Sequence, residues 1–173
     1  RLAAVAKLKM VAAFDMGGTS TDVCLVQAGR LHTDTGSIAG LPLPLPTVDV
    51  HTVGCGGGSI AYRDSGGALR TGPESAGAVP GPACYGKGTE PTVTDAHVAL
   101  GHIGRDTLLG GGMPIDADRS VRAIERLAKR LSLTTARTAE GILEVADATM
   151  ARAIMRVTGE RGVDPASVPL VAY

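Results

Sequence analysis

Residues 11–31 read VAAFDMGGTSTDVCLVQAGRL, two apolar runs that flank a segment of glycine, hydroxyl and acidic residues. The first run, residues 11–14, is short and uncharged, which is typical of a strand buried on both faces. The second run, VCLVQ, predicts the hairpin partner of that strand, with the chain reversing at Thr19 to Thr21. We therefore expect a β-hairpin that carries a glycine-rich turn.

The segment between the two runs has the pattern D-x-G-G-T-x-x-D, which suits a phosphate group. Glycines lack a Cβ, so the backbone can approach an anion closely and its N–H groups can converge on phosphate oxygens. Threonine and serine add hydroxyl donors, and carboxylates can hold a hydrated Mg²⁺ ion. The predicted phosphate-site residues are Gly17, Gly18, Thr19, Ser20, Thr21 and Asp22, with Asp15 and Asp22 as the metal ligands.

Two alternatives stay open for this segment. It could be a plain glycine turn whose acidic residues face water, although the length of the pattern favours phosphate binding. Asp22 could reach the metal or could simply cap the hairpin. The segment is not a P-loop, because no G-K-[ST] sequence is present.

Composition argues against several functional classes. Lysine and arginine together number 17, as do aspartate and glutamate, and only 2% of the 173 residues are aromatic, so the basic and stacking surfaces of a nucleic-acid binder are absent. No window approaches the roughly twenty apolar residues of a membrane span. Three cysteines without a C-x-x-C pair suit a reducing compartment. We expect a cytoplasmic protein.

The rest of the chain predicts an α/β or α+β domain over residues 1–173. Apolar residues at helical spacing predict two helices within residues 113–162, and residues 167–173 begin another buried strand. Residues 33–112, rich in glycine and proline, predict an ordered functional loop region that contains short strands. The other predicted elements are the end of an amphipathic helix over residues 1–10 and strands near Thr47–Val53, Ser59–Tyr62 and Ala68–Arg70.

Long motifs carry a resemblance to known proteins. FDMGGTSTDV, residues 14–23, resembles the phosphate loop of the actin-like ATPase superfamily. VDVHTVGCGGGSIAYRDSGGALRTGPESAGAVPGPACYGKGTEPTVTDAHVALGHI is similar to the hydantoinase A/oxoprolinase family, and the likeness continues through LGGGMPID, ATMARAIMRVTGERGVDP and LVAY. The resemblance covers essentially the entire chain. It implies a ribonuclease-H-like lobe of an actin-like ATPase, with a mixed sheet and helices.

The resemblance also implies a reaction and partners. Family members use ATP to open lactam or hydantoin rings such as 5-oxoproline, and relatives carboxylate ketones. An earlier D-x-G-G-T-x-x-D loop and a glycine-rich adenosine loop are absent here, so the chain resembles the second lobe alone. We expect a fragment that is inactive alone, with a missing first lobe and a hydantoinase B-type subunit as partners.

The chemistry gives ATP a physical purpose. An amide carbonyl is a poor electrophile, and phosphorylation of its oxygen creates a good leaving group, so ring opening by water becomes favourable. The protein then supplies positioning and neutralisation of charge on the transferred group. By resemblance, Asp15 would position Mg²⁺ or the attacking group, and Gly17, Gly18 and Thr19 would hold phosphate.

A second glycine segment, GCGGGSI at residues 54–60, raises the same question. Gly56, Gly57, Gly58 and Ser59 could approach the substrate or the transferred phosphoryl group closely. The alternative is a hinge or a tight entry into a strand.

Further candidates surround these glycines. His51 and Asp95 are predicted to contact the substrate as catalytic residues. A metal site built from Asp95, His97 and His102 is an alternative, which the resemblance disfavours because the family more often has asparagine at the His97 position. Cys84 has no neighbouring base in the sequence, so we interpret it as a buried thiol.

Other functional classes remain alternatives to the ring-opening enzyme. The chain could be part of an ATP-dependent ketone carboxylase, of another actin-like kinase or activator ATPase, or of a scaffold without a ligand of its own. We also expect self-association, because residues 1–10 and the strand PLVAY would expose apolar surface and an unpaired edge in an isolated lobe.

Overall fold

The computed structural model describes residues 7–38, 41–106, 108–110 and 112–173. The chain forms two compact units. The first unit contains residues 1–16, 21–52 and 151–173, and the second contains residues 17–20 and 53–150. The expectation of one domain stays a prediction.

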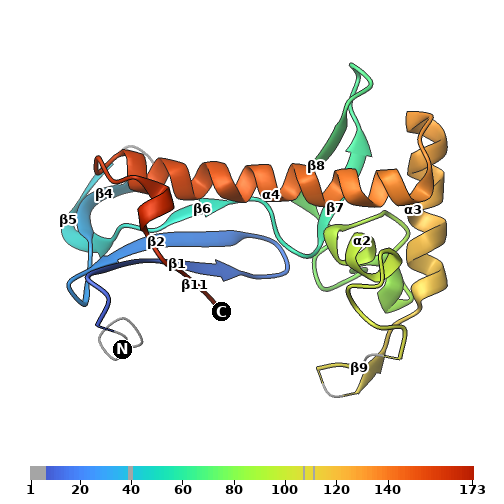
Figure 1. The fold of residues 1–173 in the computed structure, drawn as a ribbon, viewed down its shortest axis with the longest axis horizontal. Helices are drawn as coiled ribbons and strands as arrows, with labels where there is room; N and C mark the ends of the chain where they lie inside the picture. The colour runs from blue at the N-terminus through green and yellow to red at the C-terminus, as the bar shows by residue number, and fades with distance from the viewer. Residues whose placement is uncertain (1–6, 39–40, 107, 111) are drawn as a thin grey trace. The chain divides into compact units, whose positions relative to one another are not determined.

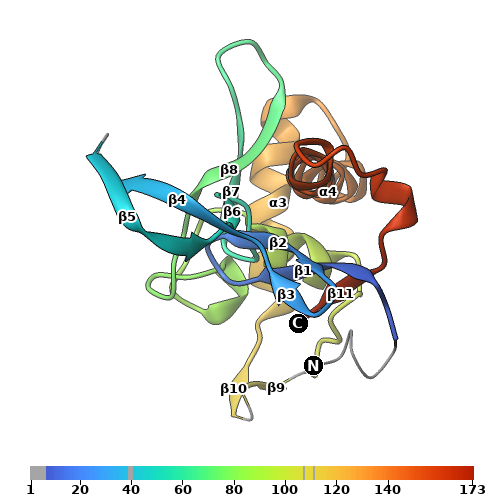
Figure 2. The same cartoon turned by 90° about the vertical axis from the view of Figure 1, so that its left-hand side faces the viewer.

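A mixed sheet forms the centre of the first unit (Figures 1 and 2). β1 (Met10–Met16) pairs antiparallel with β2 (Thr21–Gln27) and parallel with β11 (Leu170–Ala172). β3 (Arg30–Leu31) and β6 (His51–Val53) both pair with β2. The predicted hairpin, the predicted final strand and the α/β class with a mixed sheet are confirmed.

Alternation along the hairpin explains its burial. Ala12 lies opposite Leu25, and Phe14 lies opposite Val23, so these four side chains share one face of the sheet. Ala12, Val23 and Leu25 are almost completely buried. The turn occupies residues 17–20, slightly earlier than predicted, because Thr21 is already paired with Met16 in the ladder.

The described part of residues 1–10 does not form the predicted amphipathic helix. Residues 1–6 of the predicted helix lie outside the described residues. Lys7 to Lys9 are not helical, Lys7 has a positive φ of 54°, and Met10 already belongs to β1. The described part of this segment therefore leads into the sheet as irregular chain.

A second hairpin was not predicted. β4 (Thr33–Ile38) pairs with β5 (Leu41–Val48), in a stretch that we expected to be loop (Figure 2). Every second residue from 42 to 46 is proline, which lacks the N–H of a ladder bond but is tolerated in edge strands. The strand predicted over Thr47–Val53 is divided between β5 and β6, because Asp49 and Val50 interrupt it.

In the second unit, short elements of regular structure lie within the predicted loop region. β7 (Ser59–Arg63) and β8 (Leu69–Ser75) form the predicted hairpin, whose turn is closed by Asp64 accepting bonds from the Ala68 amide and the Arg70 side chain. The remaining elements before residue 115 are the 3₁₀ helix η1 (Ala83–Tyr85), α2 (Val93–Ala99), and the short strands β9 (Leu108–Leu109) and β10 (Met113–Pro114).

The two predicted helices are confirmed. α3 (Ala117–Leu131) begins at the N-cap Asp116 and buries Ile124 and Leu127. α4 (Thr135–Gly159) follows after a short turn, and its residues up to Met150 belong to the second unit. The 3₁₀ helix η2 (Pro165–Ser167) then precedes β11. No helix in the described ranges combines the length and the apolar character that crossing a membrane requires.

Asp95 connects three elements of the second unit. Its carboxylate is completely buried and forms a capping box with Thr92 at the start of α2. It also accepts hydrogen bonds from the backbone amides of Ala83 (3.0 Å) and Cys84 (2.9 Å) in η1, and from the hydroxyl of Ser120 (2.6 Å) in α3. A buried carboxylate needs such donors to offset its lost hydration. These contacts give Asp95 a structural function, and the geometry does not support the predicted contact with substrate.

We predict that Asp95→Ala lowers the free energy of unfolding by about 3 kcal/mol or more, because buried amide and hydroxyl donors lose their acceptor. Chemical denaturation checks this value. Asp106→Ala is the matched control, since Asp106 is exposed and its side chain bonds to no described residue. Equal stability of the two variants would contradict the structural function of Asp95.

Candidate phosphate site

Two glycine-rich segments meet in the second unit. The turn at residues 17–20 is closed by the Gly17 amide donating to the Ser20 carbonyl at 2.9 Å. The Gly57 amide donates to the Gly17 carbonyl (3.1 Å), and the Gly58 amide donates to the Gly18 carbonyl (2.6 Å). The second segment therefore holds the turn through two backbone hydrogen bonds.

This contact explains the glycines of the second segment. A Cβ on Gly56 would lie 2.6 Å from the Gly17 carbonyl oxygen, and one on Gly58 would lie 2.8 Å from the Gly18 carbonyl oxygen. Both distances are shorter than Cβ contacts in real structures. The close approach expected at residues 56–58 is thus made to the first turn. A ligand contact is not needed to explain it.

Ser59 and Gly57 are also used within the protein. Ser59 is completely buried, and its hydroxyl oxygen accepts a hydrogen bond from the Gly56 amide at 2.8 Å. The Gly57 carbonyl accepts from both the amide and the hydroxyl of Thr94, each at 2.8 Å. These bonds fix the shape of the second segment. The predicted ligand contacts of both residues remain predictions.

Gly18 and Thr19 keep free donors. Both residues are exposed, and their backbone amides donate to no residue in the described part of the chain. A Cβ on Gly18 would meet no atom within 4 Å, so the space beside it is open. The hydroxyls of Thr19 and Ser75 lie 3.5 Å apart. Two successive free amides on an exposed turn suit an oxyanion.

A cavity of about 290 Å³ borders this turn. The residues around it come from five places in the second unit, and they combine glycine backbone, hydroxyl groups and apolar side chains. They are Gly18, Thr19, Gly57, Gly58, Gly77, Ala78, Pro82, Tyr85 and Thr94. Burial, followed by the neighbouring Cys84 and Asp95, raises the pKa of the Tyr85 phenol, which therefore stays protonated and able to donate a hydrogen bond.

The last five of these residues were missed in the sequence. The density of glycine and proline between residues 76 and 88 indicated an ordered loop there, but the pattern names no individual side chain. The capping signal formed by Thr92 and Asp95, three residues apart, could have placed the start of α2 and with it Thr94.

The two acidic residues of the motif face each other in the first unit. Asp15 and Asp22 are direct partners in the β1–β2 register, so their side chains lie on the same face of the hairpin. Both are half-buried. The Thr52 hydroxyl donates to Asp22, whereas the Asp15 side chain bonds to no described residue. Like charges in this position repel, and a cation bound between them would relieve the repulsion. Paired carboxylates open to water fit the preference of Mg²⁺.

The other predicted residues have varied surroundings. His51 lies half-buried in β6 of the first unit and is not among the residues that line the cavity. Ser20 supplies the carbonyl that closes the turn, and Thr21 is completely buried in β2. Cys84 is buried, and desolvation followed by the Asp95 charge raises the pKa of its thiol to about 12, which agrees with its interpretation as a buried thiol.

His97 and His102 form a close pair instead of a metal site with Asp95. Their Nδ1 atoms lie 3.0 Å apart. Among the described residues, no group of three or more histidine, cysteine, aspartate or glutamate side chains could hold a metal ion. Burial is the main cause that lowers the pKa of His97, and the neighbouring His102 adds to it, against an opposing effect of Asp147.

Comparison with known proteins assigns the fold to a class and to a family. The structure superimposes with a TM-score of 0.89 on the crystal structure of an ATP-dependent caprolactamase from Pseudomonas jessenii, at 41% identity, and the match covers 98% of this chain and 25% of that chain. The fold is therefore that of α/β proteins which include ATP-dependent enzymes. The chain belongs to the hydantoinase/oxoprolinase family, whose model matches residues 1–173.

Two curated relatives have different activities. The chain is 44% identical to the caprolactamase subunit alpha of Pseudomonas jessenii, over 91% of this chain and 23% of that protein. It is also 44% identical to the acetophenone carboxylase gamma subunit of Aromatoleum aromaticum, over 95% of this chain and 23% of that protein. The chain thus spans about a quarter of the length of these relatives.

We predict that Gly56→Ala destabilises the protein by about 1–3 kcal/mol, because its Cβ would collide with the backbone of the first turn. Gly18→Ala is the matched control, since its Cβ would enter open space at an ordinary φ. Thermal unfolding of both variants measures the difference. A Gly56→Ala protein as stable as Gly18→Ala would show that the two segments are not in contact.

The histidine pair gives a pH prediction. Because the pKa of His97 is lowered in the folded state, the unfolded chain binds the proton more readily. The contribution of His97 to the free energy of unfolding is therefore fully present above the ordinary pKa of 6.5 and is lost as the pH falls below that value. We expect the unfolding temperature to fall less between pH 7 and pH 5 in His97→Asn than in the parent. His32→Asn, which changes an exposed histidine, is the control and should follow the parent. Identical pH profiles for the parent and His97→Asn would contradict the prediction.

Proposed function

We propose that this chain supplies a phosphate-binding part of an ATP-dependent enzyme that opens a cyclic amide. The observation that carries the proposal is the turn at residues 17–20, with its exposed amides of Gly18 and Thr19 that have no partner among the described residues. The name of the family and the ATP-dependent caprolactamase of similar structure support the same reaction class.

The turn has the properties of an anion site. Its amides are held in place before a ligand arrives, because Gly57 and Gly58 fix the carbonyls of Gly17 and Gly18. A preorganised donor loses little entropy on binding and can stabilise charge that develops on a transferred phosphoryl group. The Thr19 hydroxyl would add a third donor to the same oxyanion.

Asp15 and Asp22 would hold Mg²⁺, and the ion would neutralise part of the charge of a nucleotide phosphate. Their paired register and partial exposure leave room for water and phosphate oxygens among the ligands. Asp15 is the stronger ligand candidate, because Asp22 already accepts the hydrogen bond from Thr52. His51 remains a candidate for contact with the substrate.

The reaction follows from the poor reactivity of an amide carbonyl. Transfer of the terminal phosphoryl group of ATP to the carbonyl oxygen weakens the carbon–oxygen bond, and water then adds to the carbon. Cleavage of the carbon–nitrogen bond then opens the ring, with the nitrogen taking a proton from water, and leaves an acyl phosphate. A second water molecule hydrolyses this acyl phosphate to a carboxylate and free phosphate. The turn acts on the phosphoryl group, and the chain needs no contact with the rest of the substrate for that task.

A second candidate function is ATP-dependent carboxylation of a ketone. The identity to the acetophenone carboxylase subunit equals the identity to the caprolactamase subunit, 44% in each case. The two functions share a phosphate site, so the features of the turn fit both. Because the chain spans only about a quarter of these relatives, we expect turnover to require further protein, namely the first lobe together with a hydantoinase B-type subunit.

Binding of Mg²⁺-ATP tests the proposal. We expect weak binding by titration calorimetry, reduced about tenfold in Asp15→Asn because one charged ligand is lost. Chelation of Mg²⁺ should weaken nucleotide binding by the parent by a similar factor and should affect nucleotide binding by the variant less. The control Asp106→Asn should bind like the parent. Equal binding by the parent and Asp15→Asn, with and without Mg²⁺, would remove the acidic pair from the site.

A further inference from the structure

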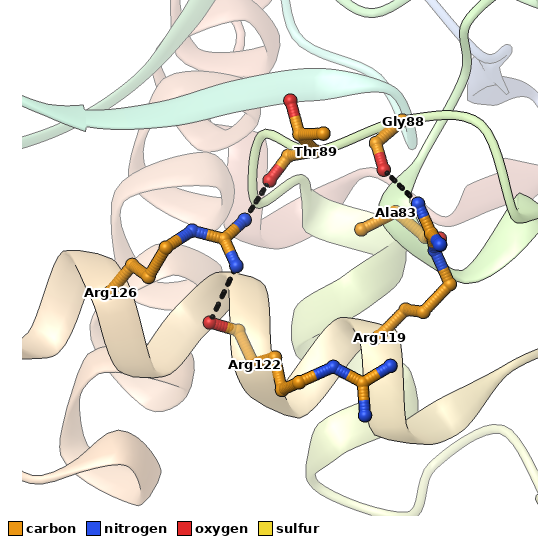
Figure 3. Close-up of a pocket in the computed structure, with 6 residues that line it drawn as sticks. All are labelled: Ala83, Gly88, Thr89, Arg119, Arg122 and Arg126. Carbon is orange, nitrogen blue, oxygen red and sulfur yellow. Dashed lines mark hydrogen bonds between the residues drawn. The ribbon is translucent and has the colours of Figure 1, made fainter.

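The second unit contains another cavity, which the proposed function does not use. It has a volume of about 150 Å³ and lies between α3 and the loop that follows η1 (Figure 3). Three arginines line one side, and backbone of the loop lines the other. The complete lining is Ala83, Gly88, Thr89, Arg119, Arg122 and Arg126. No carboxylate is among these residues.

The spacing along α3 brings the three arginines together. Positions separated by three and four residues lie on the same face of a helix, so Arg119, Arg122 and Arg126 form one row. Figure 3 shows the guanidinium groups of Arg119 and Arg126 directed at the loop. Arg119 donates to the carbonyls of Ala83 (3.1 Å) and Gly88 (3.0 Å), and Arg126 donates to the carbonyls of Thr89 and Arg122.

These bonds leave the positive charge uncompensated. All four acceptors are neutral carbonyl groups, and none of the three arginines forms an ion pair within the described ranges of the chain. Acidic residues of the same helix are paired elsewhere, Asp118 with Arg105 and Glu125 with Lys129. The Arg122 side chain makes no hydrogen bond to the described residues. A set of like charges held this close is relieved by an anion.

The loop side of the cavity is preformed. A Cβ on Gly88 would lie 2.0 Å from the Gly81 carbonyl oxygen, so the backbone of the loop is closed on itself at this point. Asp95 fixes the amides of Ala83 and Cys84 in η1, directly before this loop. The arginines therefore face a wall of defined shape, and a ligand would not have to order it.

We propose that this arginine pocket is a binding site for a small oxyanion of the phosphate type. Arginine presents planar forks of N–H donors that match phosphate oxygens, and several guanidinium groups together favour a doubly charged anion over a singly charged one. Arg122 would supply the main contact, since its guanidinium group donates to none of the residues that the structure describes. Arg119 and Arg126 would add charge and their remaining donors.

The position of the pocket couples a bound anion to the phosphate site through the backbone. Pro82 and Tyr85 line the larger cavity, and Ala83 and Gly88, from the same segment of residues 82–88, line the arginine pocket. An anion that attracts Arg119 would change the hydrogen bonds by which this arginine holds the loop. Both cavities thus share one short segment of backbone.

Titration with inorganic phosphate at constant ionic strength, followed by amide NMR spectra of the chain, tests the site. We expect saturable shifts of the Gly88 and Thr89 amides. Arg122→Gln should weaken this binding about tenfold or more, because it removes a charge-assisted contact without removing any bond of the fold. Arg130→Gln is the matched control, as it removes an exposed arginine of the same helix that does not line the pocket, and it should bind like the parent.

Three outcomes would overturn the proposal. They are the absence of saturable shifts at Gly88 and Thr89, equal weakening by Arg122→Gln and Arg130→Gln, and binding of acetate as tight as that of phosphate, which would assign the pocket to a carboxylate. Shifts of the Gly18 and Thr19 amides report separately on the first site. Asp15→Asn should leave the Gly88 and Thr89 response unchanged, so failure of either proposal can be recognised independently of the other.

Discussion

The buried carboxylate of Asp95 is the interaction on which the second unit depends. It is held by backbone amides of η1, by Thr92 at the start of α2 and by Ser120 of α3, so three segments that are distant in the sequence share one acceptor. Burial of such a charge is unfavourable unless its oxygens are fully hydrogen-bonded. Once formed, the network places Tyr85 and Thr94 beside the larger cavity and the loop after η1 beside the arginines.

The two glycine-rich segments, residues 17–20 and 56–58, are in direct contact through their backbones. Each carbonyl of Gly17 and Gly18 is held by an amide of the second segment, and this approach excludes a Cβ at Gly56 and Gly58. Gly18 has open space beside it, so its lack of a side chain serves access to the exposed amides. Glycines that look alike in the sequence therefore have two uses, packing in one segment and openness in the other.

The features that local patterns encode could be predicted. The β1–β2 hairpin follows from two apolar runs around a glycine turn, and α3 and α4 follow from apolar residues at helical spacing. The β4–β5 hairpin was missed because alternate prolines suggest a loop, although an edge strand tolerates them. α2 was missed because a helix of seven residues shows little periodicity.

The part of the candidate site that lies within one local motif could also be predicted from the sequence. The motif indicated Gly17 to Asp22 as a group, but the contact with residues 56–58 depends on tertiary structure and appears in no local pattern. Asp95 was predicted to contact the substrate, whereas in the structure it is the buried acceptor of the second unit. Its partners at residues 83, 84 and 120 are too distant in the sequence to reveal the network.

The parallel pairing of β1 with β11 has a consequence for how the chain folds. Ala12 pairs with Leu170, so the ladder joins positions separated by nearly the entire sequence. Closing so long a loop is slow, since chain entropy must be lost before the contact forms. During synthesis, the residues of the second unit leave the ribosome before β11 does. The hairpin and helices of the second unit can therefore form before β11 is available to pair with β1. Until β11 has been synthesised, the edge of β1 that it covers is open to pairing with other chains.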